Sequence, residues 1–315
     1  MYLVCGEALF DVFAESSSGA AGNRLALDAV AGGSPFNVAL GLCRLGAAAG
    51  LFTGLSRDYL GQQLRRVLDD EGVATAFLVE LDAPTTLAMV ALDDEGTPHY
   101  SFRGEGCADR LLGPEHLPTL DDRIRGIHLG SYSLVVQPTA DTLLALVRRE
   151  SGRRLISLDP NVRLNVEPDI QRWLTCLDEL VDHADLIKVS EEDLALLYPN
   201  QDAERIAAGW LERGCRLVFL TRGGDGACVF NQRHGRLCVP ARPVEVRDSV
   251  GAGDSFQAAL LAWLAERGLD TRDALDDLSR DDLEALLAFA AEAAAITCTR
   301  TGPDLPYRRE LGMQN

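Results

Sequence analysis

The residues best suited to carry out chemistry lie in one short stretch, 248–255, which reads Asp-Ser-Val-Gly-Ala-Gly-Asp-Ser. A Gly-Ala-Gly step directly precedes Asp254, and a run rich in Ala and Leu follows, as is typical of a mostly buried helix. Small residues at a helix start let backbone N–H groups point at one anion, which the helix dipole also favours. Asp254 in the first turn would place a proton acceptor beside this anion site. Phosphoryl transfer to a hydroxyl needs both functions.

A plainer interpretation of the same stretch is a glycine-rich loop followed by a helix with an Asp cap. Glycine-rich loops alone are a weak functional signal. The rest of the sequence therefore has to decide between the two interpretations.

Short apolar segments alternate with helical patterns, and from about residue 120 the order is mostly strand, helix, strand, helix. This order predicts an α/β fold with a doubly wound, mostly parallel sheet flanked by helices. The predicted strands are 2–6, 9–14, 49–53, 125–130, 155–159, 185–189, 216–221, 227–231 and 235–239. The predicted helices are 35–46, 58–71, 138–150, 170–183, 191–198, 203–213, 252–267 and 281–298.

Two segments, 12–31 and 86–104, have strand patterns without crossover helices, and the second contains a turn at 93–96. We expect them to pair into a small β-sheet lid over the carboxyl edge of the main sheet, where ligands bind in open α/β folds. A lid there would exclude water during phosphoryl transfer. A decorative flap is the alternative, and an oligomer contact is compatible with a lid. The α/β catalytic domain would then comprise 1–11, 32–85 and 105–315.

Composition limits the class of partner. The 315 residues carry a net charge of −18, which argues against nucleic acid and against an anionic membrane surface. No signal-like start and no apolar run of membrane-spanning length occurs, so we expect a cytoplasmic protein. Eight cysteines are scattered without a Cys-x-x-Cys pair, and most are expected to be reduced, buried apolar residues.

The segment 31–37 predicts a helix start with room for a ligand. Ser34 reads as the N-cap, Pro35 as the first helical residue, and Gly46 as the stop. These assignments alone describe an ordinary helix. The bare backbone of Gly32 and Gly33 ahead of the cap would also let a ligand approach closely.

Polar side chains elsewhere could recognise a sugar or a phosphate. Asn37, in the first turn, could bond a hydroxyl, and Asp11 could accept two hydroxyls in bidentate fashion unless it is a plain turn carboxylate. The run Asp159-Pro-Asn161-Val-Arg163 follows an apolar strand, a position more typical of a site than of a core. Arg163 could clamp the transferred phosphate there.

Two further segments suit the nucleotide side. Glu191 starts a helix, where the dipole alone explains acidic residues, but it could also order Mg²⁺ through water. The run 221–226, Thr-Arg-Gly-Gly-Asp-Gly, joins two predicted strands. A hairpin turn explains its glycines, and so does a nucleotide-phosphate loop in which Thr221 or Arg222 faces the ligand. The sequence has no P-loop motif, and no Gly-x-Gly-x-x-Gly opens the first βα unit.

Together these residues resemble the ribokinase-like (PfkB) carbohydrate kinases, nearly from end to end. The resemblance rests on the Gly-Gly…Asn helix start at 32–37 and on the Asp-Ser-Val-Gly-Ala-Gly-Asp-Ser-Phe signature at 248–256. Within the family the chain is most similar to bacterial fructokinases, through 6–11, 159–163, 188–191 and 298–302. The resemblance implies a ribokinase-like fold with a β lid often used for dimerisation. It also implies ATP, Mg²⁺ and transfer of the γ-phosphate to a primary sugar hydroxyl, most simply D-fructose to fructose 6-phosphate.

The resemblance also assigns roles to single residues. The catalytic group comprises the general base Asp254, the anion hole Gly251, Ala252 and Gly253, and Arg163 near the phosphate. The sugar-binding group comprises Asp11, Gly32, Gly33, Asn37, Asn161 and, on the lid side, Arg103. The nucleotide and Mg²⁺ group comprises Lys188, Glu191, Thr221, Arg222, Gly223 and Gly226. Asp248 and Val250 match positions that help bind K⁺ in some members. Lys188 replaces a frequent Asn and adds positive charge near the triphosphate.

The sequence therefore predicts an ATP-dependent sugar kinase that binds a sugar and ATP and forms a homodimer through the lid. One alternative is a kinase of the same fold acting on 2-keto-3-deoxygluconate, a nucleoside or another hexose, because fold does not fix the substrate. Alternatives of other classes are a catalytically silent sugar-binding protein and a dinucleotide-dependent oxidoreductase. A sugar-dependent ATPase assay and a test of NAD binding would separate these classes.

Overall fold

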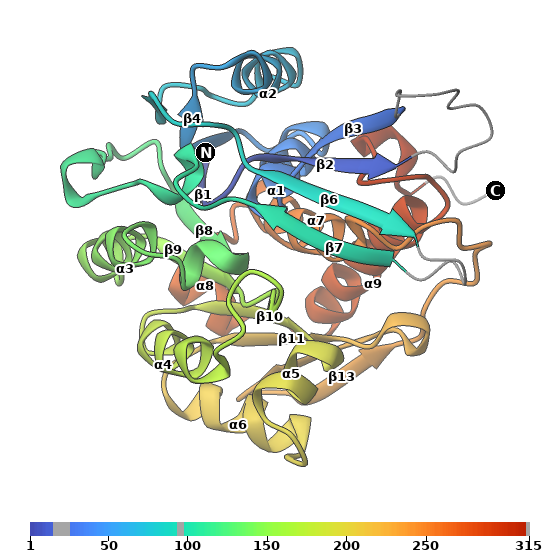
Figure 1. The fold of residues 1–315 in the computed structure, drawn as a ribbon. Helices are drawn as coiled ribbons and strands as arrows, with labels where there is room; N and C mark the ends of the chain where they lie inside the picture. Colours follow the sequence, from blue (N-terminus) through green and yellow to red (C-terminus); the bar gives the residue numbers. More distant parts are fainter. Residues whose placement is uncertain (15–25, 93–97, 313–315) are drawn as a thin grey trace.

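Alternate residues of the first strand, β1 (Tyr2–Cys5), belong to two different apolar clusters. Tyr2 and Val4 contribute to one cluster, whereas Leu3 and Cys5 contribute to the other. Because successive side chains of a strand point to opposite faces, β1 must be covered on both sides. The computed structural model, which describes residues 1–14, 26–92 and 98–312, shows this arrangement (Figure 1).

The main sheet of the described residues has nine strands in the order β13-β12-β11-β10-β9-β8-β1-β4-β5. The pairs from β5 to β11 are parallel, and β12 and β13 add an antiparallel edge. The remaining strands are β4 (Ala49–Ser56), β5 (Leu78–Leu81), β8 (Gly126–Gly130), β9 (Leu155–Asp159), β10 (Leu186–Ser190), β11 (Leu217–Thr221), β12 (Ala227–Asn231) and β13 (Gly235–Val239). The predicted α/β fold with a mostly parallel sheet is confirmed.

Helices cover both faces of this sheet (Figure 1). One apolar cluster contains residues of α1 (Ser34–Arg44), α2 (Tyr59–Asp70), α7 (Ala252–Glu266), α8 (Arg272–Asp277) and α9 (Arg280–Cys298). The other cluster contains residues of α3 (Thr139–Glu150), α4 (Ile170–Val181), α5 (Glu191–Leu197) and α6 (Ala203–Glu212). Helix α7 is buried from Asp254 to Leu264, which explains why its sequence is apolar on all sides.

A second, smaller sheet has the order β3-β2-β6-β7. Its strands are β2 (Leu9–Ala14), β3 (Leu27–Gly32), β6 (Leu87–Leu92) and β7 (Pro98–Arg103). The two antiparallel pairs β2–β3 and β6–β7 are joined by the parallel pair β2–β6. Strand β2 begins soon after the carboxyl end of β1, and α1 begins soon after β3. This sheet therefore lies at the carboxyl edge of the main sheet.

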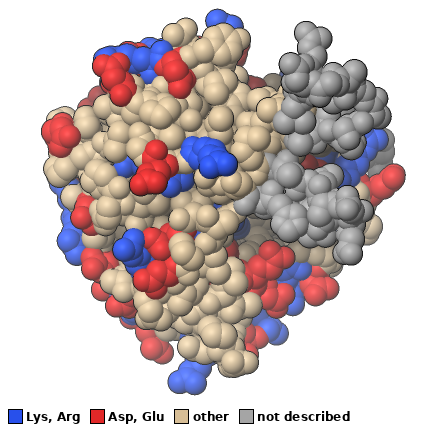
Figure 2. Space-filling model, in the orientation of Figure 1, with Lys and Arg blue, Asp and Glu red and all other residues tan. Residues whose placement is uncertain are grey.

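The predicted strands and helices are present, and their ends differ from the predicted ones by at most a few residues. Strand β5 and helix α8 are additional elements. The turn predicted at 93–96 and the segment 15–25 of the predicted lid lie outside the described residues. Within the described part of the chain, no helix is both long and apolar enough to cross a membrane. Basic and acidic side chains are interspersed on the face in Figure 2.

Candidate active site

The start of α7 has the backbone geometry of an anion site. Gly251 is the N-cap residue and has a left-handed backbone with φ 79°. A Cβ atom at this position would lie 2.8 Å from Cα of Pro303, so glycine is required for both reasons. The first N–H groups of a helix lack intrahelical acceptors. The N–H of Ala252 donates to the carbonyl of Ser249 at 3.2 Å, which leaves the flanking amides of Gly251 and Gly253 as the better donors to a ligand.

Asp254 lies one residue beyond this step and is only 7% exposed. The hydroxyl of Ser34 donates to its Oδ1 at 2.6 Å, and the side-chain amide of Asn37 donates to its Oδ2 at 2.8 Å. The prediction that Ser34 caps α1 is wrong, because Gly33 is the N-cap and makes no side-chain cap bond. The Ser34 hydroxyl instead holds the carboxylate of Asp254 from across the site.

A buried ion pair lies next to the α7 start. Lys188 Nζ donates to Asp159 Oδ2 at 2.8 Å, and the two side chains are 4% and 0% exposed. A Cβ atom on Gly253 would lie 2.9 Å from Lys188 Nζ, so the ammonium group is directed at the start of α7. Burial lowers the pKa of Lys188, but the attraction of Asp159 outweighs it, and the net shift is upward. The positively charged ammonium group of Lys188 thus lies beside the candidate anion site.

The loop after β9 is held by the start of α5. The backbone N–H of Val162 donates to Asp193 Oδ1 at 2.8 Å, and Asp193 also accepts from the Ser190 hydroxyl at 2.7 Å. Asn161 has a left-handed backbone with φ 41°, which Asn tolerates better than most residues. Glu191 is exposed in the first turn of α5. These contacts fix the loop that carries Arg163.

Asp11, on β2, joins the same cluster from the smaller sheet. Burial raises the pKa of its carboxyl to about 6, the Arg163 charge opposes this shift, and the Asp254 charge adds to it. These electrostatic effects require the three groups to be close to one another. A Cβ atom on Gly32 would lie 2.5 Å from Asp11 Oδ2, so Gly32 lies against the carboxylate. Arg103 lies exposed at the end of β7, and its predicted sugar contact stays a prediction.

The predicted nucleotide loop is a hairpin connection between β11 and β12, as one interpretation of its glycines predicted. The N–H of Arg222 donates to the Gly226 carbonyl at 2.8 Å, and Arg222 Nη2 donates to the Asp225 carbonyl at 3.1 Å. Thr221 ends β11 and is half-buried. Because β9, β10 and β11 are parallel neighbours, this loop lies along the same sheet edge as Asp159 and Ser190.

The residues at the sheet edge fit Mg²⁺ and K⁺ in different ways. The described residues contain no group of three or more His, Cys, Asp or Glu side chains that could enclose a metal ion. Mg²⁺ often keeps its water and binds substrate phosphates, so an exposed carboxylate such as that of Glu191 suits it. Asp248 accepts the N–H of Val250 at 3.0 Å and the N–H of Gly302 at 2.8 Å, which brings two chain segments together. A carboxylate has further lone pairs for a cation such as K⁺.

Sequence reasoning missed the contacts between distant residues. Asp159 appeared only as part of a polar run, although it is the partner of Lys188. The loop-holding role of Asp193 also had no sequence signal beyond a Ser-x-x-Asp helix start. The disulfide between Cys228 and Cys238 was not expected, while the other cysteines are free as predicted. The available signal was the position of these two cysteines on the consecutive predicted strands 227–231 and 235–239.

Comparisons with known proteins identify the family of this chain. The pfkB family carbohydrate kinase profile matches residues 2–309. A fructokinase of Rhizobium leguminosarum bv. trifolii is 35% identical over 284 residues, covering 90% of this chain and 85% of the relative. A fructokinase of Salmonella typhimurium is 33% identical over 318 residues, covering 99% of this chain and 98% of the relative. The crystal structure of a Xylella fastidiosa fructokinase with bound ATP superposes with a TM-score of 0.86 at 29% identity, covering 98% of this chain and 96% of that one. The chain therefore belongs to the pfkB family of carbohydrate kinases.

Proposed function

We propose that this protein transfers the γ-phosphoryl group of ATP to the primary hydroxyl of D-fructose, giving fructose 6-phosphate and ADP. The observation that carries the proposal is the position of Asp254, which Ser34 and Asn37 hold beside the start of α7. A proton acceptor adjoining an anion site and a buried cation is what phosphoryl transfer to a hydroxyl requires. The choice of fructose is supported by the names of the relatives from Rhizobium, Salmonella and Xylella.

In the proposed reaction, Asp254 accepts the proton of the sugar hydroxyl while the hydroxyl oxygen attacks the γ-phosphorus of ATP. The bond from that phosphorus to the β–γ bridging oxygen breaks, and ADP leaves. The amides of the 251–253 step, Arg163 and Lys188 stabilise the negative charge that spreads over the transferred group. We expect little reorganisation in this step, because Ser34 already holds the carboxylate of Asp254.

The sugar would lie between the smaller sheet and the start of α1. Asp11 accepts two sugar hydroxyls, and Asn37 exchanges its bond to Asp254 for a bond to the sugar. The remaining proposed sugar contacts are Gly32, Gly33, Asn161 and Arg103. This placement would let the smaller sheet act as a lid that excludes water from the reaction. A homodimer formed through the same sheet, and a cytoplasmic location, are further parts of the proposal.

ATP would lie along the carboxyl ends of β10 and β11, with Thr221, Arg222, Gly223 and Gly226 around the nucleotide. Glu191 would hold Mg²⁺ through water, and bound Mg²⁺ would neutralise charge on the β- and γ-phosphates. Asp248 and the backbone at Val250 would hold K⁺ close to the 251–253 step. Omitting K⁺ should then lower the rate without changing which sugar is selected.

The test is ADP release by the purified protein with ATP and Mg²⁺, with and without K⁺, across a sugar panel. The panel holds fructose, 2-keto-3-deoxygluconate, ribose, glucose and adenosine. Selective turnover with fructose supports the proposal. Selective turnover with another member would overturn the choice of fructose and leave the kinase mechanism in place. No turnover with any of them would contradict the proposed reaction.

A further inference from the structure

We propose that Cys228 and Cys238 form a redox-sensitive pair that sets the affinity of the neighbouring loop for ATP. The proposal rests on the proposed nucleotide role of the loop 221–226 and on the proposed cytoplasmic location. The two cysteines are joined by a disulfide, whereas the other cysteines of the chain are free. Disulfides in reducing compartments are mostly transient, catalytic or redox-sensing, and a chain with a core of this size does not need one as a staple.

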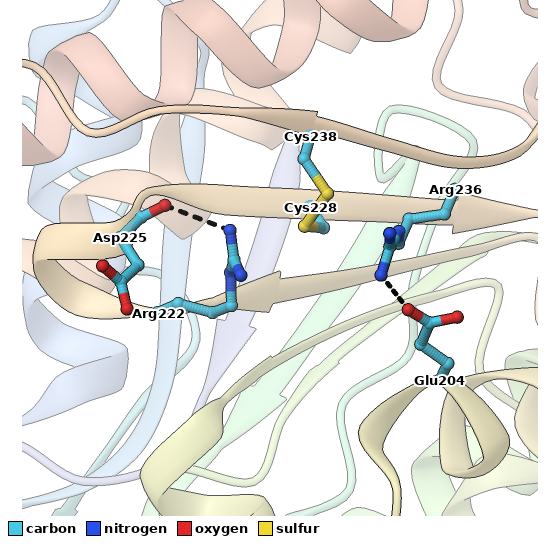
Figure 3. The surroundings of a disulfide bond; sticks show 6 residues. All are labelled: Glu204, Arg222, Asp225, Cys228, Arg236 and Cys238. Atoms are coloured by element: carbon cyan, nitrogen blue, oxygen red, sulfur yellow. Dashed lines mark hydrogen bonds and ion pairs between the residues drawn. A yellow bond between two sulfur atoms is a disulfide. The ribbon is translucent and has the colours of Figure 1, made fainter.

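The disulfide lies directly beside the proposed nucleotide loop (Figure 3). Cys228 of β12 faces Cys238 of β13, and the next pair toward the loop is Ala227 with Val239. Gly226, the last residue of the loop, immediately precedes Ala227. One residue pair therefore separates the disulfide from the loop.

The end of β13 forms a wall against that loop. A Cβ atom on Gly226 would lie 2.1 Å from the Val239 carbonyl oxygen and 2.7 Å from the Ala241 nitrogen. The Gly226 carbonyl in turn accepts the N–H of Arg222 at 2.8 Å. A shift of β13 relative to β12 would thus change the backbone of Gly226 and the position of Arg222.

Strand β13 is an edge strand that also packs against α9 through its buried face, where Leu237 belongs to the apolar core. It pairs with β12 on one side, and the side chain of Arg236 pairs with Glu204 of α6 (Figure 3). The chain then runs through 240–250 to the α7 start at Gly251. The disulfide is the covalent link between the two strands at the end nearest the nucleotide loop.

The two cysteine residues differ in accessibility. Cys228 is 2% exposed, whereas Cys238 belongs to the exposed residues of the edge strand. A thiolate of a small dithiol can attack the Cys238 sulfur, which breaks the S–S bond and releases Cys228 as a thiolate that takes up a proton. The second thiol of the reagent then displaces Cys238 and forms the cyclic disulfide. The protein disulfide is reduced by two electrons and the dithiol is oxidised by two.

We expect the oxidised form to bind ATP more tightly, because the disulfide holds β13 against Gly226. Reduction should raise the KM for ATP on the order of fivefold, near the lower end of typical coupling between two sites. The KM for fructose should stay unchanged, because the proposed sugar contacts lie on the smaller sheet, at the start of α1 and in the loop after β9. A general loss of folding would change both constants.

The experiment measures both KM values on the full-length protein after equilibration with reduced or oxidised dithiothreitol, with thiols counted by alkylation and mass spectrometry. Cys238→Ser should have the KM for ATP of the reduced protein and should not respond to dithiothreitol. Cys43→Ser changes a free cysteine near the carboxyl end of α1. Its KM for ATP should respond to dithiothreitol as that of the unaltered protein does. Thr221→Ala serves as the reference for the loop itself and should raise the KM for ATP in both redox states.

An unchanged KM for ATP after complete reduction would overturn the proposal. If Thr221→Ala still raises it, the nucleotide loop is correctly placed and only the redox coupling fails. If neither reduction nor the Thr221→Ala substitution changes the KM for ATP, the proposed nucleotide role of the loop 221–226 is also wrong. Alkylation of both cysteines without added reductant, in protein purified under air, would overturn the disulfide itself.

Discussion

Gly41 of α1 lies against Ala258 of α7, one helical turn beyond the hydrogen bond between Asn37 and Asp254. A Cβ atom on Gly41 would lie 2.8 Å from the Ala258 Cβ and 2.5 Å from Leu305 Cδ2. Residues four apart lie on the same helix face, so the close contact and the hydrogen bond share one interface. The close approach of the two helices thus places Ser34 and Asn37 within reach of Asp254.

Replacing Gly41 by Ala should force α1 and α7 apart. We expect the free energy of unfolding to fall by about 1–3 kcal/mol, as for other overpacked cores, and kcat to fall because Asn37 and Asp254 lose their alignment. Chemical denaturation and steady-state kinetics measure the two effects. Gly209→Ala is the matched control, because Gly209 lies in α6 and a Cβ atom there would meet no neighbouring group within 4 Å. A Gly41→Ala protein as stable and active as this control would contradict the role of the helix contact.

Removing the Ser34 hydroxyl should reduce turnover while the fold is kept. The hydroxyl donates to Asp254 Oδ1, and hydrogen bonds to charged groups contribute about 1.5–3 kcal/mol. We expect Ser34→Ala to lower kcat by about tenfold or more, with little change in either KM, because the base loses its orientation. Ser34→Thr keeps the hydroxyl and should retain most of the rate. Equal loss in both variants would point to packing instead of the hydrogen bond.

Sugar affinity should weaken as the solution becomes acidic. Asp11 has a pKa raised to about 6, chiefly by burial, so its carboxylate takes up a proton as the pH falls through this value. Only the ionised form accepts hydrogen bonds through both oxygens. The Kd for fructose without nucleotide should therefore rise as the pH falls from about 7 to 5. At the acid end the rise should approach tenfold for each pH unit. Asp11→Asn should bind weakly without this pH dependence, and a pH-independent Kd in the unaltered protein would refute the assignment.

The buried pair Lys188–Asp159 gives a prediction about stability. Lys188→Met would leave the Asp159 carboxylate buried without its partner, and breaking such a pair typically costs about 3–5 kcal/mol. Adding Asp159→Asn to the same chain should restore much of the free energy of unfolding, because no unpaired charge remains. Both variants should lack activity, since neither has the cation beside Gly253. Equal stability of the single and double variants would show that the pair is not coupled.

The sequence predicted the parts of the fold that depend on local patterns. The start of α7 after Gly251 and the hairpin between β11 and β12 follow from glycine positions and apolar periodicity, and both are present. Strand β5 was missed because its pattern, Leu-Val-Glu-Leu, is short and only partly buried at the sheet edge. Short segments of this kind carry too few residues for a clear period.

The contacts within the site depended on tertiary structure. Ser34 has the sequence position of an N-cap, but its hydroxyl bonds to a residue 220 positions away. A local preference is easily overridden when a buried charge needs a donor. Lys188 and Asp159 come from neighbouring strands, and their pairing follows from strand order, which single-residue patterns do not encode.

The proposed mechanism depends on Asp254 as the proton acceptor, and Asp254→Asn tests this role most directly. Asn keeps the shape of the side chain but is a far weaker base, so kcat with fructose and ATP should fall about 10²–10⁴-fold. Calorimetric binding of fructose and of ATP should remain close to that of the unaltered protein. Turnover near the unaltered rate would contradict Asp254 as the general base.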